Sequence, residues 1–184
     1  FGPDAQELRD ATLSSLIEFA ADHDFDGINV DVESLGGLAY IPAYAAFVDE
    51  LRQGITTVIP DGQVSVATTA GRQGAAMAAA ASLAGADRIF LMGYDYRVGG
   101  SEPGATAPLE RRDGSEQDLV WSLDLYESLG VPVERTILGL PLYGVTWPVA
   151  GPALGEAQVG AGDTWFPNDN LGLLASPPVP PETD

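Results

Sequence analysis

The amino-acid sequence predicts an α/β fold in which helices cover a mainly parallel β-sheet. Three strand-like segments, residues 63–70, 86–96 and 136–143, are nearly apolar throughout, as strands are when both faces of a parallel sheet are buried. Helical segments alternate with the strands along the chain, which is the pattern of an α/β protein. The length of 184 residues is of single-domain size and can bury a substantial core.

The first half of the chain contains two predicted helices and two predicted strands. Residues 4–22 carry apolar side chains at three- and four-residue spacing, which indicates a helix. Residues 28–33 alternate between apolar and polar, as a β-strand does. Residues 41–58 return to the helical spacing, and a Pro-Asp-Gly turn then leads into the strand at residues 63–70.

The second half continues the same alternation. A short alanine-rich helix is predicted at residues 73–83, followed by the strand at residues 86–96 and a loop rich in glycine and proline. A third long helix is predicted at residues 115–129, ended by a glycine, and the strand at residues 136–143 closes the regular pattern.

This organisation amounts to four βα units without an internal repeat. Four units can form an open sheet, or they can be about half of a (β/α)₈ barrel, which takes about 250 residues. In the second case the sheet should have open edges where strands are missing. We expect residues 1–149 to be the partial barrel and residues 150–184, which are rich in Gly and Pro, to be a linker or a truncated insertion.

Composition excludes several classes of function. The net charge of −19 comes from 27 acidic and 8 basic residues, so nucleic acid is not an expected partner, because binding it needs clusters of Lys and Arg. Disulfides and thiolate metal sites are excluded because the sequence has no cysteine. No apolar run approaches the roughly 20 residues that span a bilayer. The first ten residues do not resemble a signal peptide, and we expect the natural N-terminus to lie upstream.

The segment at residues 28–33 carries an unusual polar row. Its apolar residues share one face of the predicted strand, while Asn29, Asp31 and Glu33 share the other, with successive members about 7 Å apart. In a covered sheet this polar face should point into protein, where an unpaired charge is costly. We therefore expect the row to belong to a functional site.

A calcium loop is the alternative interpretation of the same segment. Residues 22–33 fit the pattern D-x-D-x-D-G-x₅-E from Asp22 through Gly27 to Glu33. The strand-like alternation, the glycines directly after the segment and Asn29 at a normally apolar loop position all count against calcium.

Three motifs in order resemble those of glycoside hydrolase family 18, the chitinase family. Asp26, Asn29, Asp31 and Glu33 occupy the four positions of its strand motif DxxDxDxE. The sequence LMGYDY at residues 91–96 resembles its Met-x-Tyr-Asp motif, and GLPLYG at residues 139–144 resembles its next strand. The resemblance implies a (β/α)₈ TIM barrel, of which this chain would hold about the middle four βα units.

The resemblance also implies the chemistry, which is retaining, substrate-assisted hydrolysis of β-linked N-acetylglucosamine polymers. Glu33 would be the general acid and base, and the 2-acetamido oxygen of the substrate would be the nucleophile. Asp31 would bind the acetamido N–H, and Tyr94 would donate its hydroxyl to the acetamido oxygen. Asp95 would contact the sugar.

Further residues are expected around this centre. Asn29 stands where aspartate is commoner in the family, so Asp31 lacks a like-charged neighbour. Met92 is expected to line the barrel interior near substrate, and Tyr143 and Trp147 could stack on sugar rings. Asp26 and Gly27 are expected to brace the turn before the strand.

The resemblance implies neither a cofactor nor a metal, and its expected partner is a polysaccharide or oligosaccharide. A secreted or cell-wall location is expected, without insertion into the membrane. The substrate stays open between chitin, peptidoglycan and N-glycans, as does the oligomeric state. Val32 stands where many chitinases have tryptophan, which favours other branches of the family. A non-catalytic lectin on the same scaffold is the main alternative, although family lectins typically lose the acid that Glu33 supplies here.

Overall fold

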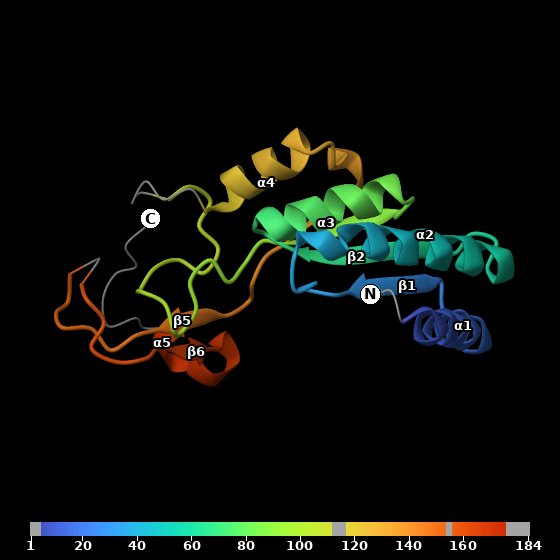
Figure 1. The fold of residues 1–184 in the computed structure, drawn as a ribbon. Coiled ribbons are helices and arrows are strands. Elements are labelled where there is room, and N and C mark those ends of the chain that lie inside the picture. The colour runs from blue at the N-terminus through green and yellow to red at the C-terminus, as the bar shows by residue number, and fades with distance from the viewer. Residues whose placement is uncertain (1–4, 112–116, 154–155, 176–184) are drawn as a thin grey trace. The chain divides into compact units, whose positions relative to one another are not determined.

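The computed structural model describes residues 5–111, 117–153 and 156–175 (Figure 1). The chain divides into two compact units, each described below by itself. The first unit comprises the chain up to Met92 together with Ser122–Leu138, and the second comprises Gly93–Trp121 together with the chain from Gly139 onwards.

The first unit is built on a four-stranded sheet with the order β1-β2-β3-β4. Strands β1 and β2 are parallel, as are β2 and β3, which confirms the predicted parallel sheet. Strands β1 and β4 are its edges, as expected where neighbouring strands are missing. The elements that contribute to this unit are α1 (Gln6–Asp22), β1 (Gly27–Asp31), η1 (Leu38–Tyr40), α2 (Ile41–Val58), β2 (Gln63–Thr69), α3 (Arg72–Leu83), β3 (Arg88–Met92), α4 (Leu119–Ser128, from Ser122 on), η2 (Val133–Arg135) and β4 (Thr136–Gly139, up to Leu138).

The core of this unit lies between the sheet and the helices α2 and α3, which cover one of its faces (Figure 1). Val64 and Val66 of β2, Ile89 of β3 and Leu51 of α2 are completely buried there. Burial of these side chains removes apolar surface from water and holds the helices on the sheet. The opposite face of the sheet carries the polar row of β1.

Strand β1 begins at a position that requires glycine. Gly27 has a φ of +153°, and a Cβ atom there would collide with the backbone carbonyl oxygen of Gln63. The Gln63 N–H donates to the carbonyl oxygen of Asp26 at 2.9 Å. Asp26 and Gly27 therefore hold the first rung between β1 and β2 through their backbone, which fits the turn-bracing role expected for them.

An ion pair ties helix α2 to the same end of the sheet. Arg52 of α2 contacts Asp87 through both oxygens, at 2.9 Å and 3.2 Å, and the Asp87 carboxylate also accepts a hydrogen bond from the Val64 N–H at 2.8 Å. This end of the sheet is thus fixed by polar contacts, and the opposite end carries the candidate site.

Several predicted elements are longer than the observed ones. Strand β3 ends at Met92 rather than at residue 96, and β4 ends at Gly139 rather than at residue 143. Glycine follows or ends each strand, and Pro141 cannot donate to a sheet ladder, so both strands stop early. The strand with the polar row also ends early, at Asp31. Helix α4 begins at Leu119, whereas the predicted start falls on residues 112–116, outside the described residues.

The second unit contains a small two-stranded antiparallel sheet of β5 (Gly144–Thr146) and β6 (Asp163–Trp165). It is followed by η3 (Pro167–Asn170) and the short helix α5 (Leu171–Ala175). Strand β6 thus lies within the stretch expected to be a linker or a truncated insertion, and the division at residue 149 stays a prediction. No helix within the described ranges is both long and apolar enough to cross a membrane.

Candidate functional site

The polar row of β1 occupies one face of the sheet in the first unit. Asn29 and Asp31 alternate with the buried Val30 along the strand, and Glu33 follows two residues after the strand ends. Asn29 pairs with Ser65 of β2, whose Oγ donates to Asn29 Oδ1 at 2.8 Å. The neighbouring strand therefore holds the middle of the motif in place, and sequence reasoning missed this role of Ser65.

The expectation that this row is buried in protein is wrong for the described residues. Asn29, Asp31 and Glu33 are all exposed. Asn29 and Asp31 lie on the face of the sheet away from α2 and α3, on the edge strand β1, and Glu33 follows two residues after that strand ends. The carboxylates are accordingly solvated in this chain, and their burial cost does not arise.

Met92 lies on the same face of the sheet as the row. In the strand register Asn29 pairs with Ser65 and Thr69 pairs with Met92, so these four side chains alternate onto one side. Met92 is buried, with 8% of its surface exposed. Its position agrees with packing at the floor of the row, and its contact with substrate stays a prediction.

The buried phenol of Tyr44, on helix α2, interacts electrostatically with the Asp31 carboxylate. Tyr44 is completely buried. Burial, and to a lesser degree the Asp31 carboxylate, raise the pKa of the Tyr44 hydroxyl well above its ordinary value. The sequence placed Tyr44 on the apolar face of a helix, which is correct, but no sequence signal linked it to Asp31.

Titration of the protein with alkali should detect this phenol. The folded-state pKa of Tyr44 is raised, so below about pH 10, the ordinary tyrosine pKa, the phenol is neutral in both the folded and the unfolded protein and costs no stability. As the pH rises further, the unfolded chain ionises first, and the folded protein loses stability until its own phenol ionises. Tyrosinate absorbance should therefore show a late-ionising class of tyrosines, and Tyr44→Phe should remove one member of it. An unchanged late class in the variant would contradict the assignment.

The calcium-loop interpretation does not agree with this geometry. Gly27–Asp31 forms an extended strand paired to β2, whereas a calcium loop bends the same positions around the ion. Asp22 is the last residue of helix α1. Across the described residues, no group of three or more His, Cys, Asp or Glu side chains is arranged to hold a metal.

The second unit contains Tyr94 and Asp95, which lie in the loop after β3 and not on the strand as predicted. Asp95 has a φ of +61°, in the left-handed region that residues other than glycine rarely adopt. The Tyr143 hydroxyl donates to Asp95 Oδ1 at 2.6 Å. The rings of Tyr94 and Tyr143 meet edge to face with centroids 6.3 Å apart. The ring centroid of Phe166, a residue that the sequence analysis did not identify, lies 6.5 Å from that of Tyr143.

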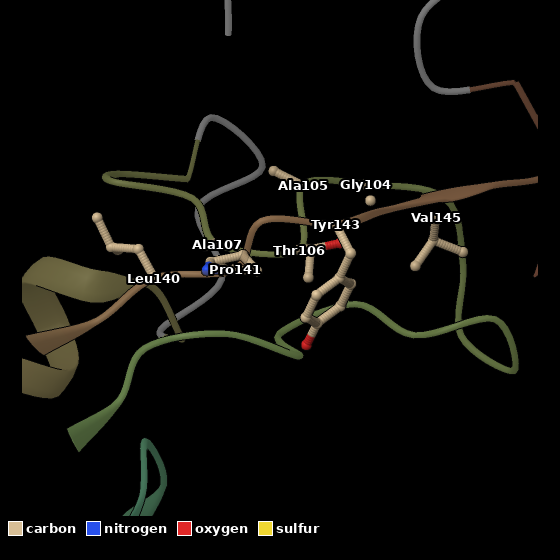
Figure 2. A pocket seen from close by; sticks show the side chains of 9 residues that line it. Gly104, Ala105, Thr106, Ala107, Leu140, Pro141, Tyr143 and Val145 are labelled. Atoms are coloured by element: carbon tan, nitrogen blue, oxygen red, sulfur yellow. The ribbon is translucent and has the colours of Figure 1, made fainter. Parts of the chain in front are cut away.

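Tyr143 also forms part of an open pocket of about 490 Å³ within the second unit (Figure 2). In Figure 2 its ring lies at the pocket, and its hydroxyl oxygen is turned away from the other labelled residues. None of the lining residues is charged; they are Gly104, Ala105, Thr106, Ala107, Leu140, Pro141, Tyr143, Gly144 and Val145. The pocket therefore suits an uncharged group.

Trp147 is held by two other segments of the second unit. Its Nε1 donates to the carbonyl oxygen of Ser101 at 3.1 Å, and a Cβ atom at Gly162 would come within 2.7 Å of the indole ring. The ring is half-buried. These contacts explain why tryptophan and glycine face each other here, and sugar stacking by Trp147 stays a prediction.

The predicted site residues thus fall into two groups. Asn29, Asp31 and Met92 share one sheet face of the first unit, and Glu33 follows the end of β1 in the same unit. The second unit brings together Tyr94, Asp95 and Tyr143, and it also contains Trp147.

A family model described as "Glycosyl hydrolases family 18" matches residues 4–174 of this chain. No curated protein matches it. The solved structures that resemble it include catalytic domain 2 of a group II chitinase from Ostrinia furnacalis, with 24% identity and a TM-score of 0.71; the match covers 82% of this chain and 43% of that one.

Two further solved structures share the fold. The match to a chitinase from Cycas revoluta in complex with (GlcNAc)3 has 22% identity and a TM-score of 0.76, and covers 91% of this chain and 54% of that one. The match to a chitinase from Trichuris suis has 22% identity and a TM-score of 0.70, with coverages of 83% and 45%. The chain therefore spans about half the length of these structures, and it holds part of their barrel.

Proposed function

Because the chain belongs to family 18 of the glycosyl hydrolases, we propose that it carries the acid/base centre of a retaining, substrate-assisted hydrolase of β-linked N-acetylglucosamine polymers. The single observation that carries this proposal is the polar row of β1, in which Asp31 and Glu33 follow Asn29 at the carboxyl end of a parallel strand. Active sites of α/β barrels are built at that end of the strands.

In this proposal Glu33 protonates the glycosidic oxygen while the acetamido oxygen of the substrate attacks the anomeric carbon. The bond between that carbon and the glycosidic oxygen breaks, and a cyclic oxazolinium intermediate forms. Glu33, now a carboxylate, takes a proton from the water that opens the intermediate. Two displacements at one carbon retain its configuration, and no protein nucleophile is needed.

Asp31 and Tyr94 act on the acetamido group. Asp31 accepts a hydrogen bond from the acetamido N–H, and its negative charge stabilises the positive oxazolinium ring. The Ser65–Asn29 hydrogen bond supports this role, because it fixes the strand position next to Asp31. Tyr94 and Asp95 enter the proposal through their places in the Met-x-Tyr-Asp motif, Tyr94 as a donor to the acetamido oxygen and Asp95 as a sugar contact.

Chitin-type oligosaccharides are the substrates we favour. The solved structure from Cycas revoluta contains (GlcNAc)3, and the pocket of the second unit has no charged lining residue. The net charge of −19 would repel a polyanionic polymer and leave a neutral one unaffected. A secreted or cell-wall location, where such polymers occur, goes with this proposal.

Two matched substrates test it, assayed with a protein that includes the whole catalytic domain. A β-1,4-linked N-acetylglucosamine oligomer should be hydrolysed, and the fully deacetylated glucosamine oligomer should not be, because it lacks the acetamido nucleophile. Hydrolysis of both oligomers at similar rates would rule out the substrate-assisted mechanism. Binding of the acetylated oligomer without hydrolysis would indicate the lectin.

A further inference from the structure

Two segments of the second unit meet at Asp95. The Gly93 N–H donates to the carbonyl oxygen of Gly139 at 3.0 Å, which fixes the start of the chain after β3 beside the last residue of β4. Beyond this backbone contact, the Tyr143 hydroxyl donates to Asp95 Oδ1 at 2.6 Å. A hydrogen bond to a carboxylate at that distance belongs to the strong, charge-assisted class.

The backbone of Asp95 adopts an uncommon conformation that surrounding contacts must stabilise. A non-glycine residue in the left-handed region is uncommon, and it persists where the surroundings fix it. The hydrogen bond from Tyr143 is a contact of this kind, because it joins the Asp95 carboxylate to a residue 48 positions away.

From this geometry we propose that Tyr143 is a positioning residue, whose hydroxyl fixes the Asp95 carboxylate for its contact with the sugar. Its role is thus to act through Asp95 instead of stacking on a sugar ring. The inference rests on the proposed function, because it takes Asp95 as a sugar contact.

The surroundings of Tyr143 favour a permanent donor. Burial, the hydrogen bond to Asp95 and the charges of Asp95 and Tyr94 all raise the pKa of the Tyr143 hydroxyl above its ordinary value. The phenol therefore keeps its proton at neutral pH and donates it to the carboxylate. The ring of Tyr143 lines the pocket and packs edge to face with Tyr94. These ring contacts do not involve the hydroxyl, so the hydroxyl can be removed without losing them.

A double-mutant cycle on kcat/KM tests the proposal, using Tyr143→Phe, Asp95→Ala and the double variant. Tyr143→Phe keeps the ring and removes only the donor, and we expect kcat/KM for an N-acetylglucosamine oligomer to fall about 10-fold. In the Asp95→Ala background the same change should alter kcat/KM by less than about 2-fold. Tyr40→Phe, at a tyrosine that is 42% exposed, is the matched control and should leave kcat/KM unchanged.

The outcomes separate this inference from the function on which it rests. If the two effects multiply, Tyr143 acts independently of Asp95 and the proposal is wrong, while the hydrolase stands. Binding of the oligomer without cleavage would contradict the proposed function. The same double-mutant cycle is then measured on Kd, and free-energy effects of Tyr143→Phe and Asp95→Ala that add independently would overturn the proposal. If the protein neither cleaves nor binds the oligomer, both fall together.

Discussion

A Glu33→Gln variant is expected to hydrolyse N-acetylglucosamine oligomers about 10³-fold more slowly than the unaltered protein, because general acid–base catalysis contributes on that order. Glutamine keeps the size and hydrogen-bonding capacity of the side chain but cannot deliver a proton to the glycosidic oxygen. Since Glu33 is exposed beyond the end of β1, the substitution disturbs no packing. Folding and oligomer binding should therefore be preserved, as calorimetry can check.

A surface carboxylate provides the control for this experiment. Glu18→Gln changes an exposed residue of helix α1 by the same atoms and the same charge, and it should leave the rate unchanged. Equal rates for Glu33→Gln and the unaltered protein would remove Glu33 from the mechanism. Loss of binding together with activity would instead assign Glu33 to substrate affinity.

Gly27→Ala is expected to destabilise the protein by about 3 kcal/mol or more, or to prevent folding. The new Cβ would collide with the carbonyl oxygen of Gln63, and backbone cannot move aside as a flexible side chain can. Because this contact forms the first rung of the β1–β2 pair, relieving it would displace the strand that carries Asp31. Chemical denaturation measures the loss as a lower midpoint.

Gly130→Ala is the matched control for that prediction. Gly130 also has a positive φ, +82°, yet a Cβ atom there would meet nothing within 4 Å. Only the conformational cost remains, about 1 kcal/mol. A similar loss for both variants would show that the close approach of Gln63 is not what requires glycine at position 27.

The alternation at residues 28–33 was sufficient to predict the face of the strand on which Asn29 and Asp31 lie. Side chains in a strand alternate by geometry alone, so Asn29 and Asp31 could be assigned to one side of β1 without coordinates. The parallel sheet followed in the same way from apolar strands between helices. Strand alternation and the burial of both sheet faces each produce a characteristic pattern of apolar residues, so both can be recognised in the sequence.

The hydrogen bonds between residues of the candidate site could not be predicted. The Tyr143–Asp95 hydrogen bond joins residues 48 positions apart, and the Ser65–Asn29 bond joins residues 36 positions apart. No periodic pattern in the sequence indicates that such distant residues are in contact. The early end of β3, which places Tyr94 in a loop, depends on where the chain leaves the sheet. The exposure of Glu33 depends on which parts of the barrel are present.

The anomeric configuration of the first product tests the central claim most directly. An N-acetylglucosamine oligomer is hydrolysed by a protein that includes the whole catalytic domain, and the anomeric protons are followed by NMR before mutarotation. If the substrate acetamido group is the nucleophile and Glu33 serves as acid and then base, the new reducing end should appear first as the β-anomer. A first product with the α-configuration would mean a single inverting displacement and would contradict the account.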